Sequence, residues 1–225
     1  MKIEPGLFIV GTPIGNLSDI TLRALEVLRA ADVIYCEDTR RTIKLLNAYE
    51  IKKPLKSCPY FKERSQSEQI LERISRNEKV VYVSDAGMPG LSDPGHILVE
   101  VVRQAGFAVH IIGGVSALTH FVAGLSRELD NFLFCGFLPA RTKDREGYLK
   151  DASDELNLIF FESPHRIKST LELLQKFHPQ RQLSLAKELS KISEKFYEGT
   201  VESVRSSITS FKGEWIGCLW KKGST

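Results

Sequence analysis

The 225-residue chain has few cysteines and no long hydrophobic run. Cys36, Cys58, Cys135 and Cys218 form no C-x-x-C pair, which excludes the common zinc-site spacing and predicts reduced thiols rather than a disulfide framework. No apolar segment is long enough to cross a bilayer. The first residues, MKIEPGLFIVG, also lack the cationic and then apolar segments of a signal peptide. We therefore expect a cytoplasmic protein without a membrane segment.

Two nucleotide-binding signatures are absent as well. Residues 11–16, GTPIGN, space their glycines differently from G-x-G-x-x-G, and no segment matches G-x-x-x-x-G-K-[ST]. No histidine or further carboxylate lies near Asp85 and Asp93 at the spacing of a hard-cation loop, so no metal site is predicted. The formal net charge of +3 is compatible with an anionic partner but is too small to indicate a dedicated nucleic-acid-binding domain.

Short apolar runs rich in β-branched and aromatic residues alternate with stretches of helical periodicity in the first half of the chain. This alternation is typical of βα units and predicts a mainly parallel sheet. The expected strands are residues 7–10, 33–36, 54–58, 79–83 and 109–112. The expected helices begin at Ser18 or Asp19 and lie near residues 40–49, 66–77 and 95–105.

The pattern restarts after residues 113–126, which read as a small-residue helix. The expected strands are then 131–137, 157–161, 182–189, 194–200 and 214–220, with helices near 143–153, 165–177 and 200–211. The later strands follow one another through short turns, which favours a mixed sheet. The predicted fold class is therefore α/β, with a boundary between residues 115 and 125 that gives domains 1–118 and 119–225.

Clusters of polar residues and glycine directly follow four predicted strands, at 11–16 (GTPIGN), 37–40 (EDTR), 84–95 (SDAGMPGLSDPG) and 113–117 (GGVSA). Ligands of open α/β sheets bind beyond the carboxyl ends of the strands, so the four clusters are expected to converge on one crevice. Simpler interpretations also exist. Gly15 and Asn16 suit a turn with positive φ, and Asp38 suits the cap of a helix that begins near Thr39.

Charged residues in the second half of the chain can also be interpreted as either structural or ligand-binding. In FESPHR (161–166), Pro164 suits the first turn of a helix, so His165 and Arg166 would leave that turn. The guanidinium of Arg166 suits a phosphate or carboxylate, whereas a lone histidine is more often a surface or core residue. PARTKDREGYLK (139–150) is either a solvated helix face or a contact to an RNA backbone.

The motifs, taken in order, resemble those of the class III S-adenosylmethionine methyltransferases, the tetrapyrrole methylase family. They are LFIVGTPIGNLSDITLRALEVLRAADVIYCEDTR, VSDAGMPGLSDPG, FLFCGFLP, FFESPHR, AKELSK followed by EGT, and GEW, which together cover the chain nearly end to end. Within the family they are most similar to the bacterial enzymes that methylate a cytidine 2′-hydroxyl in small-subunit ribosomal RNA.

This resemblance implies two α/β domains with S-adenosylmethionine held in the cleft between them, a homodimer, and ribosomal RNA or the small subunit as the partner. The family's cofactor-contacting regions match Thr12, Pro13, Gly87, Met88, Pro89, Leu91, Ser116, Ala117 and Phe161. Glycine allows close backbone approach to a ligand and proline stiffens the loop, so these residue types suit the role. The expected substrate-binding residues are Arg40, Tyr60, Lys62, Arg64, His165 and Arg166.

A ribose hydroxyl is a poor nucleophile at neutral pH, so a carboxylate or a neutral lysine that takes its proton would assist methyl transfer. The candidates are Glu37, Asp85, Asp93 and Lys187. Asp85 and Asp93 are favoured because they flank the expected cofactor loop. Either aspartate has an equally good alternative role, which is to accept hydrogen bonds from N–H groups of the loop and fix its shape.

Three features depart from the usual family pattern. PYFKER (59–64) stands where close relatives carry a histidine-rich segment, GGVSA replaces P-G-P-S-A, and the chain ends soon after GEWIGCLW. Two other functions therefore stay open: a class III methyltransferase that acts on a tetrapyrrole, and a non-catalytic RNA- or ribosome-binding module that retains the fold. EDTR and FFESPHR favour RNA over a tetrapyrrole.

Overall fold

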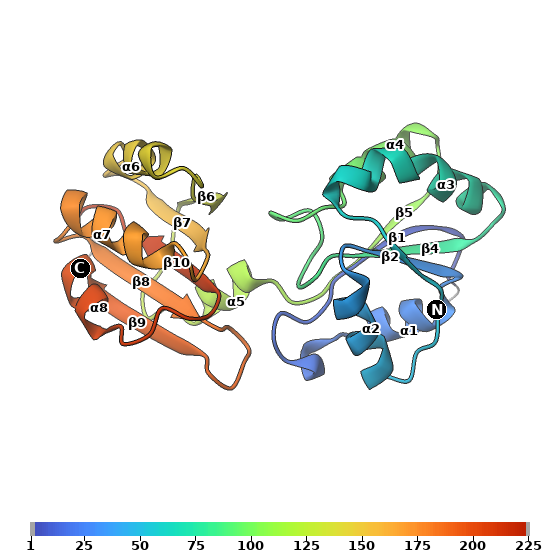
Figure 1. Cartoon of the computed structure of the whole chain (residues 1–225), viewed down its shortest axis with the longest axis horizontal. Helices are drawn as coiled ribbons and strands as arrows, with labels where there is room; N and C mark the ends of the chain where they lie inside the picture. The colour runs from blue at the N-terminus through green and yellow to red at the C-terminus, as the bar shows by residue number, and fades with distance from the viewer. Residues whose placement is uncertain (1–2, 224–225) are drawn as a thin grey trace. The chain divides into compact units, whose positions relative to one another are not determined.

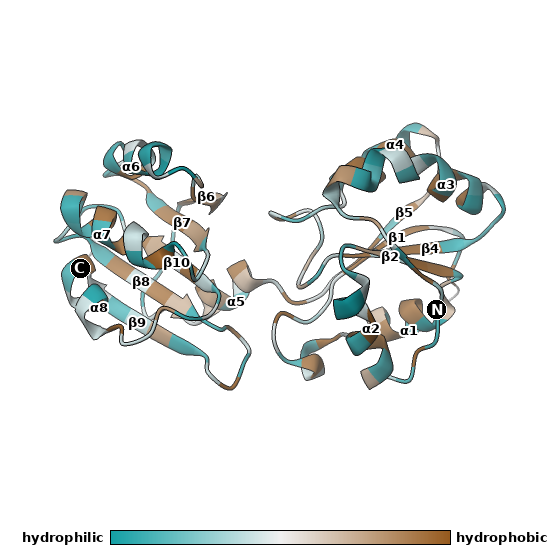
Figure 2. Cartoon of the chain, in the orientation of Figure 1, coloured by the Kyte–Doolittle hydropathy of each residue, from teal (hydrophilic) through white to brown (hydrophobic). Residues whose placement is uncertain are grey.

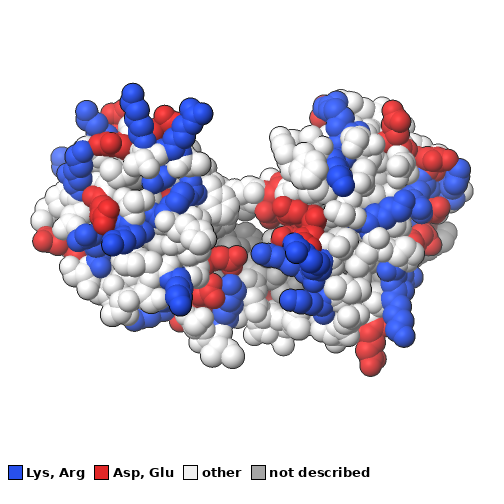
Figure 3. All heavy atoms as spheres, in the orientation of Figure 1, with Lys and Arg blue, Asp and Glu red and all other residues white. Residues whose placement is uncertain are grey.

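The computed structural model describes residues 3–223 and divides into two compact units, with the division after Ser116. Each unit combines one five-stranded sheet with several helices, so the predicted α/β fold class is confirmed (Figure 1). Lys and Arg are interspersed with Asp and Glu over the face shown in Figure 3, as expected for a small net charge. No helix within residues 3–223 is long and apolar enough to span a membrane.

Unit 1 contains a fully parallel sheet. Its strands are β1 (Gly6–Val10), β2 (Val33–Cys36), β3 (Leu55–Ser57), β4 (Lys79–Val83) and β5 (Val109–Ile112). They lie in the order β3-β2-β4-β1-β5, and Phe8 pairs with Val81 on one side and with His110 on the other. All five residues of β1 are buried because helices cover both faces of the sheet, which is why the strands are apolar throughout instead of alternating.

Four helices and two 3-10 turns complete unit 1. They are η1 (Leu17–Asp19), α1 (Leu22–Ala30), α2 (Thr39–Ala48), η2 (Tyr60–Lys62), α3 (Glu63–Ser75) and α4 (His96–Gln104). The helices α1 and α2 pack with Phe8 and Val10 on one face of the sheet, and α3 and α4 pack with Leu7 and Ile9 on the other. Figure 1 shows the two helix pairs on opposite sides of the strands.

The loop after β1 differs from the prediction. The expected helix start at Ser18 or Asp19 is wrong, because a 3-10 turn intervenes and Thr21 caps α1 by accepting from the Ala24 amide at 3.1 Å. The alternative interpretation of Gly15 and Asn16 as turn residues with positive φ is also wrong. Asn16 has a φ of −120° and instead accepts a hydrogen bond from the Ser18 amide, while Gly15 is not among the residues with positive φ.

Unit 2 contains the mixed sheet that the sequence predicted. Its elements are α5 (Ala117–Ala123), β6 (Phe132–Phe137), α6 (Thr142–Lys150), β7 (Asn157–Glu162), α7 (Ile167–Phe177), β8 (Gln182–Lys187), β9 (Lys195–Thr200), α8 (Val201–Ser207) and β10 (Trp215–Leu219). The order is β6-β7-β10-β8-β9; the β6–β7 pair is parallel and the other pairs are antiparallel. Side chains of α6, α7 and α8 share one core with β7, β8 and β10, and Figure 2 shows apolar residues concentrated in these central strands.

The described cysteines are all unpaired, as predicted. Cys36 and Cys58 are fully buried in unit 1, and Cys218 is fully buried in unit 2. Cys135 is half-buried on β6, and its thiol lies 3.3 Å from the Ile159 carbonyl oxygen. Burial raises the pKa of the Cys58 and Cys218 thiols to about 12.

Candidate functional site

The polar clusters of unit 1 lie at one edge of the parallel sheet, because each follows the carboxyl end of a strand. Thr12, after β1, pairs with Gly87, after β4, through two backbone hydrogen bonds of 2.9 and 3.0 Å. Asp85, also after β4, accepts a hydrogen bond from the Asp38 amide after β2 at 3.1 Å. The Gly113 carbonyl, after β5, accepts from the Thr21 hydroxyl at 3.3 Å. Gly114, in the same cluster as Gly113, lies against Gly11, so the four clusters lie at one edge of the sheet, and their convergence on one crevice stays a prediction.

Three of these loops meet backbone to backbone. A Cβ atom at Gly11 would lie 2.5 Å from the Met88 sulfur and 2.7 Å from the Gly114 Cα, so only glycine fits there. Gly87 has a φ of +76°, which disfavours any L side chain. Gly11, Gly87 and Gly114 are called the glycine cradle below. Gly11 and Gly87 are buried and Gly114 is half-buried, so the loops pack closely at the carboxyl end of β1.

Thr12 supplies the clearest indication of a ligand at the cradle. The residue is only 4% exposed, and its hydroxyl is one of few buried polar atoms in residues 3–223 that lack a hydrogen-bond partner. A buried hydroxyl without a partner costs free energy that a bound polar group would recover. Thr12 was predicted to contact the cofactor, and its environment fits that role.

The loop at residues 84–95 is held by its own backbone and by α3. Its Gly90 amide donates to the Pro94 carbonyl at 3.0 Å. The fully buried Glu63 carboxylate accepts from the Gly95 and Ile97 amides at 2.9 and 3.1 Å, and so caps the first turn of α4. Sequence reasoning missed Glu63 because its partners lie more than thirty positions away and no local motif indicates such a cap.

All three predicted catalytic carboxyl groups belong to this edge, and the pKa of each is raised. The pKa of Asp93 is raised to about 6, mainly by burial of the carboxyl group and also by the negative charge of Glu37. Burial and the charge of Asp85 raise the pKa of Glu37. Burial also raises the pKa of Asp85, although Arg41, whose Nε lies 3.3 Å from the Asp85 carboxylate, acts in the opposite direction.

Asp38 has the alternative, structural role. Its carboxylate caps α2 by accepting from the Arg40 amide at 2.8 Å, and the Arg40 guanidinium contacts it at 2.7 Å. These hydrogen bonds lower the pKa of Asp38 to about 2. Arg40, a predicted substrate-binding residue, is thus engaged with Asp38, although its side chain remains 87% exposed.

The other predicted substrate-binding residues of unit 1 lie in the PYFKER segment, directly after β3. Tyr60, Lys62 and Arg64 are all exposed. Because β3 runs parallel to β2, this segment lies at the same sheet edge as EDTR, and the Cys58 amide donates to the Cys36 carbonyl at 2.7 Å. Tyr60 also contacts the ring of His96, with 5.9 Å between ring centroids.

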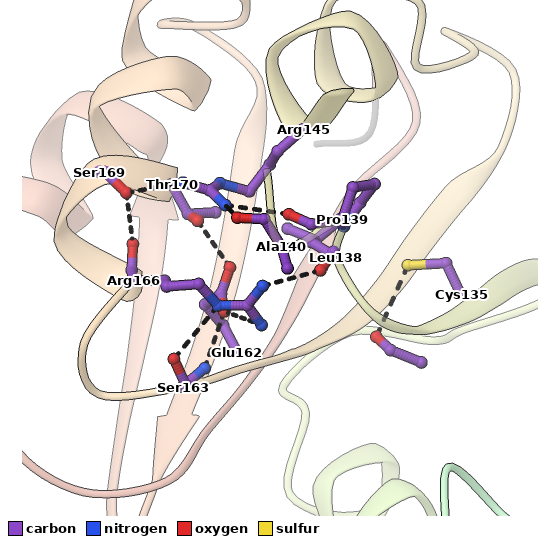
Figure 4. Close-up of polar contacts among 11 residues, drawn as sticks. Cys135, Leu138, Pro139, Ala140, Arg145, Glu162, Ser163, Arg166, Ser169 and Thr170 are labelled. Carbon is purple, nitrogen blue, oxygen red and sulfur yellow. Dashed lines mark hydrogen bonds and ion pairs between the residues drawn. The ribbon is translucent and has the colours of Figure 1, made fainter. Parts of the chain in front are cut away.

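In unit 2 the predicted residues after β7 form a closed hydrogen-bond network (Figure 4). The buried Glu162 carboxylate contacts the Arg166 guanidinium at 2.8 Å and accepts from the Thr170 hydroxyl at 2.7 Å. Arg166 also donates to the Ser163 hydroxyl and the Leu138 carbonyl. These contacts favour a structural role for Arg166 over a substrate contact. His165 is exposed, and α7 begins at Ile167, two residues later than predicted.

In the basic segment 139–150, Arg141, Lys143 and Lys150 are exposed, as expected for a solvated helix face, but Arg145 is not. This residue is 2% exposed, and its guanidinium donates to the Pro139 and Ala140 carbonyls and to the Ser169 hydroxyl (Figure 4). Arg145 therefore fixes the turn after β6 instead of binding an external anion. The charge pattern alone could not distinguish these two uses of an arginine.

The remaining predicted residues lie on both units. Pro13, Met88 and Pro89 are half-buried beside the cradle, and Leu91 is 36% exposed. Ser116 precedes α5 and Ala117 begins it. Phe161, on β7, packs against Phe134 and Phe137 with centroid distances of 5.1 and 5.5 Å. Lys187 ends β8 and donates to the Ser210 carbonyl at 3.4 Å.

No group of three or more His, Cys, Asp or Glu side chains within the described part of the chain is arranged to hold a metal ion. The raised pKa values of Glu37, Asp85 and Asp93 follow from burial and mutual charge. The edge of unit 1 thus combines a close-packed glycine cradle, an unpaired buried hydroxyl and carboxyl groups of raised basicity. Such a set can bind a polar ligand and accept a proton beside it.

Comparison with protein families gives one match over most of the chain. The profile of the family described as Tetrapyrrole (Corrin/Porphyrin) Methylases matches residues 6–205. Among curated proteins, "Ribosomal RNA small subunit methyltransferase I" of Thermotoga maritima is 47% identical over 207 residues, which cover 92% of this chain and 93% of that protein. The protein of the same name from Neisseria meningitidis serogroup B is 41% identical, over 95% of this chain and 75% of that protein.

Solved structures show the same fold at much lower sequence identity. The methyltransferase CobJ superposes with a TM-score of 0.70 at 17% identity, covering 98% of this chain and 96% of CobJ. The uroporphyrin-III-C-methyltransferase of Thermus thermophilus gives a TM-score of 0.67 at 18% identity, covering 96% and 94% of the two chains. At these identities the likeness establishes the fold alone.

Proposed function

The chain belongs to the tetrapyrrole methylase family, and we propose that it transfers the methyl group of S-adenosylmethionine to a ribose 2′-hydroxyl of small-subunit ribosomal RNA. One observation carries the choice of RNA: the 47% identity, over 92% of this chain, to a protein named for methylation of that RNA. We further propose that the acceptor is a cytidine, which rests on the sequence motifs.

The residues of the glycine cradle fit S-adenosylmethionine. Beside the cradle, Thr12 offers a buried hydroxyl that lacks a partner, and the Met88 side chain, a proposed cofactor contact, packs against Gly11. Residues 87–91, Pro13, Ser116, Ala117 and Phe161 are the proposed further contacts. When bound, the cofactor supplies a methyl group activated by a positive sulfonium, so the protein mainly has to orient the acceptor, which can lower the barrier by about 7–11 kcal/mol.

Asp93 is the proposed general base. Its pKa of about 6 makes it mainly a carboxylate at neutral pH and more basic than an exposed aspartate. Asp85 is less suited, because it already accepts from the Asp38 amide and contacts Arg41, so it is proposed to position these loops. Glu37 raises the pKa of Asp93 through its charge. Lys187 stays a candidate in unit 2.

Acceptor binding is proposed for Arg40, Tyr60, Lys62, Arg64 and His165, all of which are exposed. Arg166 was predicted to join them, but its contacts to Glu162, Ser163 and Leu138 favour a structural role. We also propose a homodimer and a cytoplasmic location, where the ribosomal substrate and reduced thiols both occur.

Mapping ribose methylation on ribosomal RNA from cells with and without the gene tests the function. We expect one small-subunit ribose methylation to disappear and to return on complementation, and the purified chain to transfer labelled methyl to small subunits from the deletion strain. An unchanged map would defeat the proposal. Methyl transfer to a tetrapyrrole would favour that acceptor, and failure to bind S-adenosylmethionine at high micromolar concentration would favour a non-catalytic module.

A further inference from the structure

Two adjacent aromatic side chains of unit 1 are largely exposed, although the Tyr60 ring contacts that of His96. Tyr60 is 59% exposed and Phe61 is 78% exposed, and both belong to the 3-10 turn η2 directly after β3. Burial of aromatic side chains contributes strongly to folding and binding, so two neighbouring exposed rings indicate a surface that binds something.

The turn that carries these rings is held firmly at both ends. On its N-terminal side, the Cys58 amide donates to the Cys36 carbonyl at 2.7 Å, and the Cys58 carbonyl accepts from the buried Tyr82 hydroxyl at 3.2 Å. On its C-terminal side, Glu63 binds the Gly95 and Ile97 amides. The backbone of the turn is therefore held in place by hydrogen bonds. This reduces the conformational entropy that is lost when a partner binds to the rings.

The exposed charged side chains that flank the rings in the sequence, Lys62 and Arg64, are both cationic. Residues 52–64 contain five cationic side chains, Lys52, Lys53, Lys56, Lys62 and Arg64. The one carboxylate of this segment, Glu63, is fully buried and occupied by backbone amides. The Lys62 ammonium also lies 5.9 Å from the centre of the Phe61 ring. Cations interspersed with exposed aromatic rings are the combination that binds single-stranded nucleic acids.

We propose that Tyr60 and Phe61 form a stacking platform for unpaired bases of the acceptor RNA, with Lys62 and Arg64 contacting its phosphates. The proposal rests on the proposed function, because it assigns the surface to the RNA that carries the reacting ribose. The platform lies at the same edge of the parallel sheet as the glycine cradle and Asp93. It would thus bind nucleotides that neighbour the modified one.

Charge decides between RNA and a second copy of this chain as the occupant. Two copies that met through this turn would bring the Lys62 and Arg64 side chains of both copies together, which is unfavourable, whereas a phosphate backbone neutralises them. Every base has a π-face, so stacking on Tyr60 and Phe61 requires no particular nucleotide sequence.

The test is the affinity of the full chain for a short fluorescein-labelled single-stranded RNA, measured by fluorescence anisotropy. We expect Phe61→Ala and Tyr60→Ala each to weaken binding about 5- to 150-fold, as loss of one stacked base does. Phe61→Trp keeps a stacking ring and should bind like the wild type. Lys62→Gln should reduce the slope of log affinity against log salt by about 0.7.

Ile192→Ala is the matched control, since it removes a fully exposed apolar side chain from unit 2 and should leave RNA affinity unchanged. Wild-type affinity in both Ala variants would overturn the platform. Unchanged affinity together with an altered sedimentation coefficient would assign the surface to contacts between copies. Failure of the wild-type chain to methylate small subunits would defeat the proposed function, whereas the RNA affinities test the platform independently of turnover.

Discussion

The pKa of Asp93 is about 6, so this carboxyl group changes its ionisation within the range of ordinary activity assays. If Asp93 takes the proton of the acceptor hydroxyl, the turnover number rises with pH through about 6 and then levels off. Asp93→Asn keeps the size of the side chain but cannot accept the proton, so we expect kcat to fall about 100- to 10,000-fold. Methylation of small subunits as a function of pH measures both effects.

Calorimetry with S-adenosylmethionine is the control for this variant, because a base acts on the acceptor and the cofactor affinity should persist. Wild-type turnover in Asp93→Asn would leave Asp93 with a loop-holding role. The same pKa has a consequence for folding. Since the folded value lies above the unfolded value of about 3.9, the contribution of Asp93 to stability is complete below pH 4 and is lost as pH rises through about 6.

Thr12 gives a second test at a single residue. Thr12→Val replaces the unpaired buried hydroxyl with a methyl group of similar size. Without the cofactor we expect the variant to be as stable as the wild type or about 1 kcal/mol more stable, because an unsatisfied polar group is removed. Its affinity for S-adenosylmethionine should fall about 5- to 10-fold through loss of one hydrogen bond.

Urea unfolding measures the stability of Thr12→Val, and calorimetry measures its cofactor affinity. The two effects have opposite signs, which a general packing defect would not produce. A variant that is both clearly destabilised and unchanged in affinity would show that the hydroxyl has a structural partner and does not contact the ligand.

At the scale of elements, Glu63 joins α3 to the start of α4 and so to the loop at residues 84–95. Glu63→Ala leaves the Gly95 and Ile97 amides without an acceptor and should lower the free energy of unfolding by about 1.5–3 kcal/mol. Glu63→Gln retains one acceptor oxygen and should lose less. Urea unfolding orders the three proteins, and amide hydrogen exchange at Gly95 and Ile97 should accelerate most in Glu63→Ala. Equal exchange in all three would contradict the cap.

The strands and the mixed or parallel character of each sheet could be predicted because they depend on local hydrophobic patterns. The residues of β1 are buried on both faces, and this is visible as a continuous apolar run. Asp38 was also foreseeable as a cap, since capping is a local interaction. The start of α1 could not be predicted in this way. The residues before it form a 3-10 turn capped by Asn16, and such a turn differs little in sequence from the start of a helix.

The roles of individual charged residues could not be predicted from local sequence where their partners are distant. Arg145 and Arg166 have equally suitable motifs for binding anions, yet both bind groups of their own unit. Glu63 reads as an ordinary surface acid of a helix, and only the packing of α3 beside α4 buries it. The motifs nevertheless located the cradle, because its glycines and Thr12 follow directly from the strand ends.

For the whole molecule, cofactor binding should appear as thermal stabilisation. At a concentration 100 times its dissociation constant, S-adenosylmethionine stabilises the folded chain by about 2.7 kcal/mol if it binds only that state. For a chain of this length we expect the Tm to rise by about 5–10 °C. Scanning fluorimetry measures the shift, and Thr12→Val should show a smaller one at equal concentration. An unchanged Tm in the wild type would contradict cofactor binding.

Each unit contains at least one buried cysteine whose reaction with a thiol reagent can report local unfolding of that unit. Cys36 and Cys58 are inaccessible in unit 1 and Cys218 is inaccessible in unit 2, while burial keeps their pKa values high and their thiolate fractions small. A thiol reagent added to the native protein therefore labels Cys135 first. The rates at which Cys36, Cys58 and Cys218 are then labelled, assigned by peptide mass, measure how often the core of each unit opens to solvent. No engineered reporter is needed.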